Sequence, residues 1–241
     1  MDLKNFITIV IPCKNENQTI DKTLSLLNLQ KNIQKTKVIV ADISDDGTTY
    51  ELESRQNDLF DLEIVQGGLP AKARNNGARL VKTPYILFLD ADIFITDKML
   101  LTNAVDTIIK KDKDLLTTRF RTTTGEYNYV FKTFDIIQRL IKPFTPFCLG
   151  GFMLVSRSIY NRCGGFNEEA KVAEDYLFSK QVKPNRFYIS KNVVYTPPRR
   201  FKNKGVFYMM KLMIKSFLNR NNKEFFINDN KYWEWKSGRQ L

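Results

Sequence analysis

Two aspartates close one of the most apolar runs of this sequence. Asp90 and Asp92 flank the small Ala91 directly after residues 85–89, which are almost continuously apolar. Two carboxylates one residue apart can bear on one hard divalent cation, and Mg²⁺ and Mn²⁺ prefer oxygen ligands while keeping places for substrate phosphate. Isolated pairs of this kind are usually turn or cap residues, but the position after a buried strand favours a ligand site. The turn therefore predicts a Mn²⁺ or Mg²⁺ site with Asp90 and Asp92 as ligands, and Ala91 leaves room for a bulky substrate.

The composition indicates the same kind of partner. The chain carries a net charge of +12, which favours nucleic acid, an acidic membrane surface or phosphate-bearing substrates. It contains no histidine, so the usual general base and the commonest transition-metal ligand are both missing. Carboxylates must then supply the base and any further protein ligand of a metal.

Length and hydropathy predict one globular domain. The 241 residues, 43% apolar and 27% charged, suit a single α/β core. No run approaches the roughly 20 apolar residues of a membrane-spanning helix, and the first residues lack the layout of a signal peptide. The three cysteines are an odd count without metal-type spacing. We expect a cytoplasmic protein without structural disulfides.

Strand and helix patterns alternate along the chain. Apolar runs predict strands over residues 6–11, 38–41, 62–65, 85–89, 115–120 and 150–155, and helical spacing predicts helices over 17–29, 70–80, 97–110, 127–141, 156–163 and 174–182. Asp97 is the expected cap of the third helix. This alternation predicts an α/β fold with a Rossmann-like, mostly parallel sheet flanked by helices, and the carboxyl ends of its strands should bind the ligand. Residues 12–16, 42–48 and 90–92 all fall at such ends, so we expect three polar loops around one crevice.

Four motifs occur in order on this scaffold. They are Val10-Ile11-Pro12-Cys13-Lys14-Asn15-Glu16, Asp42-x-Ser44-x-Asp46-Gly47-Thr48, Ala73-Arg74-Asn75-Asn76-Gly77-Ala78 and Leu87-Phe88-Leu89-Asp90-Ala91-Asp92. Together they resemble the family 2 glycosyltransferases of the GT-A fold, over roughly residues 6–182. The resemblance implies an inverting transfer of a sugar from a nucleotide-diphospho-sugar, with a UDP-sugar favoured, to a glycan or to a polyprenyl or other lipid-linked acceptor. It also implies a glycosyltransferase domain over residues 1–201, with a donor half (1–97) and an acceptor half (98–201), before a basic extension (202–241).

The resemblance assigns roles at the donor side. The first strand loop, with Pro12 and Glu16, would hold the base and ribose together with Asp42, which would accept a hydrogen bond from the nucleobase. Asp90 would lie near the ribose, and Asp92 would bind the metal that bridges the diphosphate. The family pattern often has two acidic residues at the second strand end, whereas this chain has only Asp42 there.

Three arginines are candidates for phosphate contacts. Arg74 could reach the diphosphate or ribose from the helix over residues 70–80, or it could be a solvated helix charge. Arg199 and Arg200 follow the stiff segment Tyr195-Thr196-Pro197-Pro198, which would hold both guanidinium groups as a clamp over the site. Contact with acidic lipid headgroups is the alternative for this pair.

A base must accept the proton of the attacking acceptor hydroxyl, and in this chain it should be a carboxylate. Glu174 and Asp175 follow the segment Gly164-Gly165-Phe166, and the combination resembles the acceptor half of the same family, where such a pair supplies the base. Asp175 is the predicted base, with Glu174 as the alternative or a helper. Carboxylates that merely start a helix are the competing interpretation. Gly150 and Gly151 would let the acceptor approach the backbone, or would form a tight turn.

The last segment is basic and aromatic. A helical pattern over residues 205–219 places Lys211, Lys215 and Asn219 on one stripe, with apolar side chains around the rest. This pattern is typical of a helix in a membrane interface, although packing on the core would give it too. We therefore expect peripheral contact with the inner face of a membrane, with Trp233 and Trp235 as further anchors.

Two other classes remain open. A nucleotidyltransferase on a related sheet would need a glycine-rich N-terminal loop with an arginine, which this sequence lacks. A non-catalytic basic module would use the interleaved aromatic and basic residues near the C-terminus to bind nucleic acid or membranes. The leading interpretation predicts an enzyme without a nucleic-acid partner.

Overall fold

The computed structural model describes residues 1–55 and 58–228, so Trp233 and Trp235 lie outside the described residues. The strands are β1 (Ile7–Cys13), β2 (Lys37–Asp42), β3 (Asp61–Gln66), β4 (Tyr85–Leu89), β5 (Leu115–Thr122), β6 (Phe152–Ser156) and β7 (Phe187–Thr196). The helices are α1 (Ile20–Asn28), α2 (Thr48–Glu53), α3 (Pro70–Ala78), α4 (Leu100–Lys110), α5 (Asn128–Ile141), α6 (Arg157–Arg162), α7 (Glu174–Ser179), α8 (Arg199–Lys204), α9 (Val206–Leu218) and α10 (Lys223–Ile227), with 3-10 turns η1 (Leu3–Asn5) and η2 (Pro184–Arg186).

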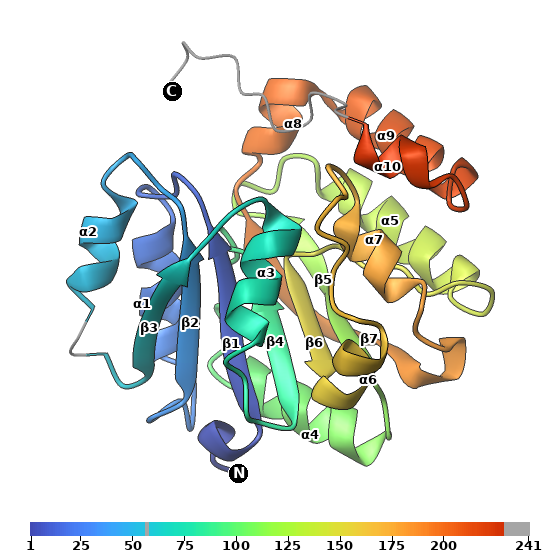
Figure 1. Cartoon of the computed structure of the whole chain (residues 1–241). Helices are drawn as coiled ribbons and strands as arrows, with labels where there is room; N and C mark the ends of the chain where they lie inside the picture. The colour runs from blue at the N-terminus through green and yellow to red at the C-terminus, as the bar shows by residue number, and fades with distance from the viewer. Residues whose placement is uncertain (56–57, 229–241) are drawn as a thin grey trace.

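One seven-stranded sheet runs through the molecule in the order β3-β2-β1-β4-β6-β5-β7 (Figure 1). The pairs β3-β2, β2-β1, β1-β4 and β5-β7 are parallel, whereas β6 runs antiparallel to both β4 and β5. The predicted α/β fold with a mostly parallel sheet is confirmed. The carboxyl ends of β2, β1 and β4 therefore lie next to one another at one edge of the sheet.

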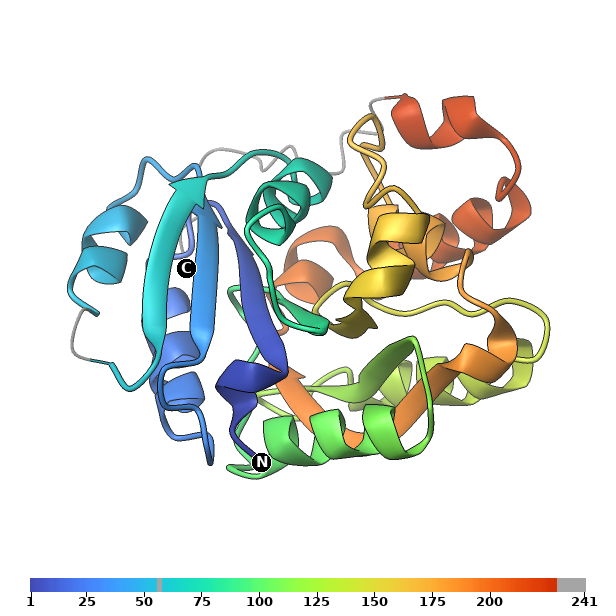
Figure 2. The same cartoon turned by 60° about the horizontal axis from the view of Figure 1, so that its bottom comes forward.

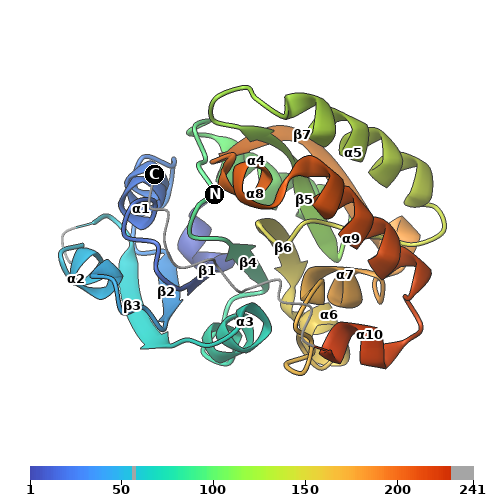
Figure 3. The same ribbon diagram turned by 90° about the horizontal axis from the view of Figure 1, so that it is seen from above.

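Alternate residues of the buried strands pack against two different layers of helices. Ile9 and Ile11 face a core that includes residues of α1, α4 and α5, whereas Val10 faces residues of α3, α6 and α7. Figure 3 shows these two groups of helices on opposite sides of the sheet. At the amino ends of the strands, η1 lies beside α4 (Figure 2). Burial on both faces explains why the strands have continuous apolar runs.

Several predicted bounds differ from the structure. Asp97 does not cap α4, because the helix begins at Leu100 and the Asp97 carboxylate instead accepts the N–H of Met99 (2.9 Å) in the preceding turn. The strand predicted over residues 150–155 begins at Phe152, since Gly150 and Gly151 form the approach to it. The edge strand β7 was not predicted, because the polar residues 190–192 interrupt its apolar pattern beside a register shift against β5.

The segment after β7 lies over the carboxyl ends of the strands as α8, α9 and α10 (Figure 1). Only α9 was predicted, because α8 buries no residue and α10 buries only Phe226, so neither shows an apolar face. Among the described residues of α9, only Ser216 is buried, so this helix does not pack into the core. None of the described helices is long and apolar enough to cross a membrane.

Candidate active site

The loops after β1 and β2 are joined by hydrogen bonds. The N–H of Asn15 donates to Ser44 Oγ (2.8 Å), and the N–H of Glu16 donates to Thr48 Oγ1 (3.0 Å). Asn15 has a left-handed backbone (φ 56°), a conformation that asparagine tolerates better than most residues, and its side chain accepts the N–H of Asp45 (3.0 Å). Two of the three predicted polar loops thus form one rigid edge of the site.

Asp42 is oriented within this edge. Its Oδ1 accepts the hydroxyl of Ser44 (2.5 Å), and its Oδ2 accepts the hydroxyl of Thr49 (2.8 Å). A carboxylate has about four lone-pair sites, so acceptor capacity is left for a ligand donor. Pro12 lies beside it in β1, opposite Ala41 of β2.

The turn after β4 forms the third loop. The N–H of Asp90 donates to the carbonyl of Gly151 (3.1 Å), and the hydroxyl of Thr23 donates to the carbonyl of Ala91 (2.7 Å). These backbone contacts fix the turn between α1 and the approach to β6. Its two carboxylates then point to different partners, Asp90 to Arg74 and Asp92 to Arg199.

Arg74 joins two sides of the site, the turn after β4 and the start of α7. From α3 its Nη2 donates to Asp90 (2.7 Å) and its Nη1 donates to Glu174 (2.6 Å), and the guanidinium lies 5.4 Å from the Phe166 ring centre. The residue is only 2% exposed. Burial lowers the pKa of Arg74, but the charges of Asp90 and Glu174 outweigh that effect and raise the pKa. Arg74 is therefore a permanently charged, buried link between the two sides.

Asp175 is held by backbone donors at the start of α7. Its Oδ2 accepts the N–H of Gly150 and its Oδ1 accepts the N–H of Tyr176, both at 2.7 Å. Ala173 is left-handed (φ 53°) and turns the chain into the helix. Burial, and next the charge of Glu174, raise the pKa of Asp175 to about 7. A carboxylate with such a pKa can accept a proton near neutral pH.

The two glycines before β6 serve close packing. A Cβ on Gly150 would lie 2.7 Å from Nη2 of Arg74, and one on Gly151 would lie 2.9 Å from side-chain atoms of Ile93 and Phe120. Any larger residue at Gly150 would push into the Arg74 and Asp175 contacts. Close packing within the protein is therefore enough to explain both glycines.

Arg199 reaches from α8 to the loop after β1 and the turn after β4. Its Nη2 donates to Oε2 of Glu16 (2.5 Å), to Oε1 of the same residue and to Oδ2 of Asp92 (2.9 Å). Burial, followed by the charge of Asp92, raises the pKa of Glu16. Arg200 follows it in α8 and is half-buried.

The carboxylates around Arg199 are suitable ligands for a divalent cation. Within the described residues no three His, Cys, Asp or Glu side chains form a metal cluster. However, oxygens of Glu16 and Asp92 converge on a single guanidinium nitrogen, which shows that both side chains can share one positive charge. Hard cations such as Mg²⁺ take one or two carboxylates and complete their shell with phosphate and water. The residues present therefore fit such an ion.

One supporting residue, Asn75, was not predicted. Its Oδ1 accepts the N–H of Phe166 (2.9 Å) and the hydroxyl of Tyr160 (2.8 Å), while its Nδ2 donates to the carbonyl of Phe166 (2.8 Å). These bonds fix the Gly164-Gly165-Phe166 segment beside α3. The available signal was its position next to Arg74 in the third motif.

Comparison with known proteins identifies the family. The sequence model described as "Glycosyl transferase family 2" matches residues 8–164. This chain belongs to that family, as its motifs predict. Poly-beta-1,6-N-acetyl-D-glucosamine synthase of Staphylococcus aureus (strain COL) is 32% identical over 92 residues, 37% of this chain and 22% of the relative. The Staphylococcus epidermidis protein of the same name is 34% identical over 95 residues, 38% of this chain and 23% of the relative. The matched part of this chain therefore covers less than a quarter of the length of each of these relatives.

Solved structures establish the fold as GT-A. Staphylococcus aureus TarS superposes with a TM-score of 0.63 at 23% identity, over 89% of this chain and 40% of that one. The mannosyltransferase PcManGT of Pyrobaculum calidifontis, in complex with GDP-Man and Mn²⁺, gives a TM-score of 0.66 at 20% identity, over 87% of this chain and 64% of that one. A shorter TarS chain in complex with UDP-GlcNAc gives 0.62 at 23% identity, over 80% of this chain and 58% of that one.

Proposed function

We propose that this protein is an inverting glycosyltransferase that moves a sugar from a nucleotide-diphospho-sugar to an acceptor hydroxyl in one displacement. The hydroxyl oxygen attacks the anomeric carbon, and the bond from that carbon to the diphosphate oxygen breaks with its electrons on the diphosphate. The hydroxyl proton passes to Asp175. Membership of the family supports this activity.

The observation that carries the proposal is the link through Arg74. One buried guanidinium bonds both Asp90 of the donor turn and Glu174 beside the predicted base. This arrangement holds a carboxylate with a pKa of about 7 on the acceptor side at a fixed position relative to the donor carboxylates. Fixed placement of a base and a leaving group is what a single displacement requires.

The donor is proposed to be a UDP-sugar bound with Mn²⁺ or Mg²⁺. Neighbouring structures with UDP-GlcNAc, or with GDP-Man and Mn²⁺, support a nucleotide-sugar and a divalent ion, and the TarS complex with UDP-GlcNAc favours uridine. Asp92 and Glu16 would hold the ion, with Asp90 nearby. The bound ion would neutralise charge on the departing diphosphate. Arg199, and Arg200 beside it, would then contact the phosphates, while Asp42 and Pro12 would line the base pocket.

The acceptor is proposed to be a glycan or a lipid-linked sugar at a membrane surface. The donor half (1–97) and acceptor half (98–201) meet at the β4-β6 pair, and the extension from residue 202 would contact the membrane through α9. The absence of buried apolar residues in α9 supports this contact.

Substitution of the base tests the proposal. Asp175→Asn should slow transfer by about 10² to 10⁴, because the hydroxyl loses its proton acceptor. Release of UDP from a panel of UDP-sugars with Mn²⁺, measured with and without acceptor, would follow the reaction, and Asp106→Asn on the surface of α4 is the matched control. Unchanged turnover in Asp175→Asn would remove Asp175 from the mechanism.

A further inference from the structure

The apolar face of α9 points to solvent. Phe207 is 80% exposed and Leu218 is 69% exposed, whereas Ser216 is buried. At about 100° per residue, Phe207, Ile214 and Leu218 share a stripe opposite Ser216. Lys211 borders this stripe, so an apolar ridge with a basic edge faces outward.

This outward orientation is imposed by anchors on both sides of α9. Before it, the ring of Phe201 packs on Tyr127 and Phe131 with centroid distances of 5.2 and 5.4 Å. After it, Phe226 is buried in a small core beside α7, and its carbonyl accepts the N–H of Lys171 (2.7 Å). The helix is thus tied down at each end while its apolar ridge stays uncovered by the described residues.

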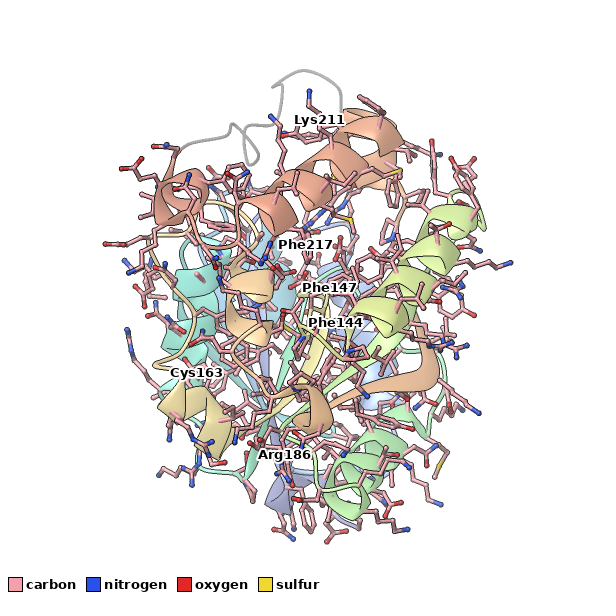
Figure 4. All side chains as sticks on the ribbon, turned by 90° about the vertical axis from the view of Figure 1, so that its right-hand side faces the viewer. Phe144, Phe147, Cys163, Arg186, Lys211 and Phe217 are labelled. Atoms are coloured by element: carbon pink, nitrogen blue, oxygen red, sulfur yellow. The ribbon has the colours of Figure 1, made fainter. Side chains whose placement is uncertain are left out.

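A second apolar ridge lies on α5. Phe131 and Phe134 face the core, whereas Ile136 and Leu140 face solvent, and Phe144, just beyond the helix, is 85% exposed. Ile136 and Leu140 are spaced by four and share one face of α5, and Phe144 is exposed in the turn that follows the helix. The views in Figures 1 and 3 agree that α5 and α9 run side by side, and Figure 4 shows Phe144 below α9 on the face of the molecule toward the viewer, with Lys211 at the top.

The surroundings of both ridges are basic. Residues 136–167 and 199–223 contain no aspartate or glutamate. Asp135, within α5, is buried against Arg121. The basic side chains of these two helices and their flanks are Lys132, Arg139, Lys142, Lys202, Lys204, Lys211, Lys215, Arg220 and Lys223. Glu126, just before α5, pairs with Lys202 (3.0 Å), and Glu224 lies in the first turn of α10, so the basic residues are in excess but acidic ones border them. Apolar ridges within a surface of such basic excess are complementary to an anionic lipid bilayer.

We propose that the outward faces of α5 and α9 form one surface that docks on an anionic lipid bilayer. We call it the α5–α9 surface, comprising Ile136, Leu140, Phe144, Phe207, Ile214 and Leu218 with the basic residues around them. This docking rests on the membrane contact in the proposed function, which involves only α9. It adds α5, whose sequence pattern did not predict such a role. Because α8 carries Arg199 into the site and leads directly into α9, docking would hold the site at the lipid surface.

Vesicle binding tests this surface. The full chain is mixed with phosphatidylcholine vesicles, with or without phosphatidylglycerol, and the bound fraction is measured by co-sedimentation. The variants are Ile136→Ser/Leu140→Ser/Phe144→Ser on α5 and Phe207→Ser/Ile214→Ser/Leu218→Ser on α9. Exposed apolar residues at the far edge of the sheet provide the matched control, Tyr50→Ser/Leu59→Ser/Ile64→Ser. The single variant Phe144→Glu changes one loop residue and tests α5 without altering a helix.

Each triple variant of α5 or α9 should bind anionic vesicles about 10-fold more weakly than the parent or worse, because three inserted apolar groups are lost. Phe144→Glu should also weaken binding, because it replaces an apolar group with a negative charge. The control variant should bind like the parent, and added salt should weaken binding. Parent-like binding by both α5 variants would overturn the proposal, as would equal binding to neutral vesicles. A dimer of the parent that the α5 variants dissociate, seen by sedimentation, would assign the surface to a second copy and also overturn it.

Donor hydrolysis separates this inference from the proposed function. UDP release without acceptor should be unchanged in the α5 and α9 variants, because none of the substituted residues contacts the site. If the parent releases no UDP from any UDP-sugar, the proposed function fails while the vesicle result still stands. Loss of hydrolysis in the α5 triple variant alone would show that its substitutions disturb the fold. Vesicle binding by Phe144→Glu would then decide the question.

Discussion

Arg74 and Arg199 perform similar tasks in two regions of the site. Each guanidinium bonds two carboxylates, and each takes one aspartate of the Asp90-Ala91-Asp92 turn. The Arg74 side chain is 3% exposed and lies between α3, β4 and α7, whereas that of Arg199 is 30% exposed at the start of α8. The same ion-pair chemistry is thus present once in the interior and once at the rim.

The difference separates a fixed link from a displaceable one. Leaving a buried charge without its partner is costly, so the Arg74 contacts must persist through any reaction cycle. The Arg199 side chain is reachable from solvent although Asp92 and Glu16 are mostly buried, so a metal ion with phosphate oxygens can replace these contacts without leaving the carboxylates unpaired. The turn is therefore anchored through Asp90 and free to bind ligands through Asp92.

The largest effect should follow from breaking the interior pair. Arg74→Met leaves Asp90 and Glu174 without their shared cation and should lower the free energy of unfolding by about 3–5 kcal/mol. Urea denaturation followed by circular dichroism measures this loss. Arg74→Lys keeps the charge but lacks the two forked donors of a guanidinium. Its free energy of unfolding should therefore fall by less than that of Arg74→Met. A variant with methionine as stable as the parent would show that these carboxylates do not depend on Arg74.

The second-largest effect should appear in the pH dependence of the transfer rate. The pKa of Asp175 is raised to about 7, and only the ionised carboxylate accepts a proton. The transfer rate should therefore be level above pH 7 and fall about tenfold per unit as the pH drops below it. Because the charge of Glu174 contributes to the raised pKa of Asp175, Glu174→Gln should move the midpoint of the rate profile to lower pH. A rate that stays level down to pH 5 would contradict the assignment of Asp175.

The sequence predicted much of the donor side because its signals are local. Apolar runs fix β1, β2 and β4, and loops at the ends of adjacent parallel strands must lie together, so the approach of Glu16 to Asp92 follows from the topology. The choice of partners did not follow. Arg74 was predicted to reach a phosphate or ribose, and that role stays a prediction. In the structure it bonds Asp90 and Glu174, and Glu174 lies 100 residues after it in the sequence.

The missed elements lacked a local signal or depended on tertiary contacts. The helix α2 begins at Thr48, the last residue of the polar segment after β2, and buries only Thr48 and Leu52, so it shows no apolar face. The strand β7 pairs at the sheet edge through a register shift that no alternation predicts. The orientation of α9 also depends on remote anchors, because Phe201 and Phe226 pack on segments distant in sequence. Its exposure argues against packing on the core, and contact with a membrane stays a prediction.

The smallest effect on stability should come from the rim pair. Arg199→Gln should lower the free energy of unfolding less than Arg74→Met does, since the Arg199 side chain is partly solvated while its partners Glu16 and Asp92 are mostly buried. Without nucleotide, the variant should bind Mn²⁺ more tightly because no guanidinium competes for Asp92 and Glu16. It should bind UDP about 10-fold more weakly, because a charged hydrogen bond to phosphate is lost. Calorimetric titration measures both affinities, with the exposed Arg79→Gln as control. Unchanged affinities for both ligands would leave Arg199 as a purely structural contact and remove the distinction between the two arginines.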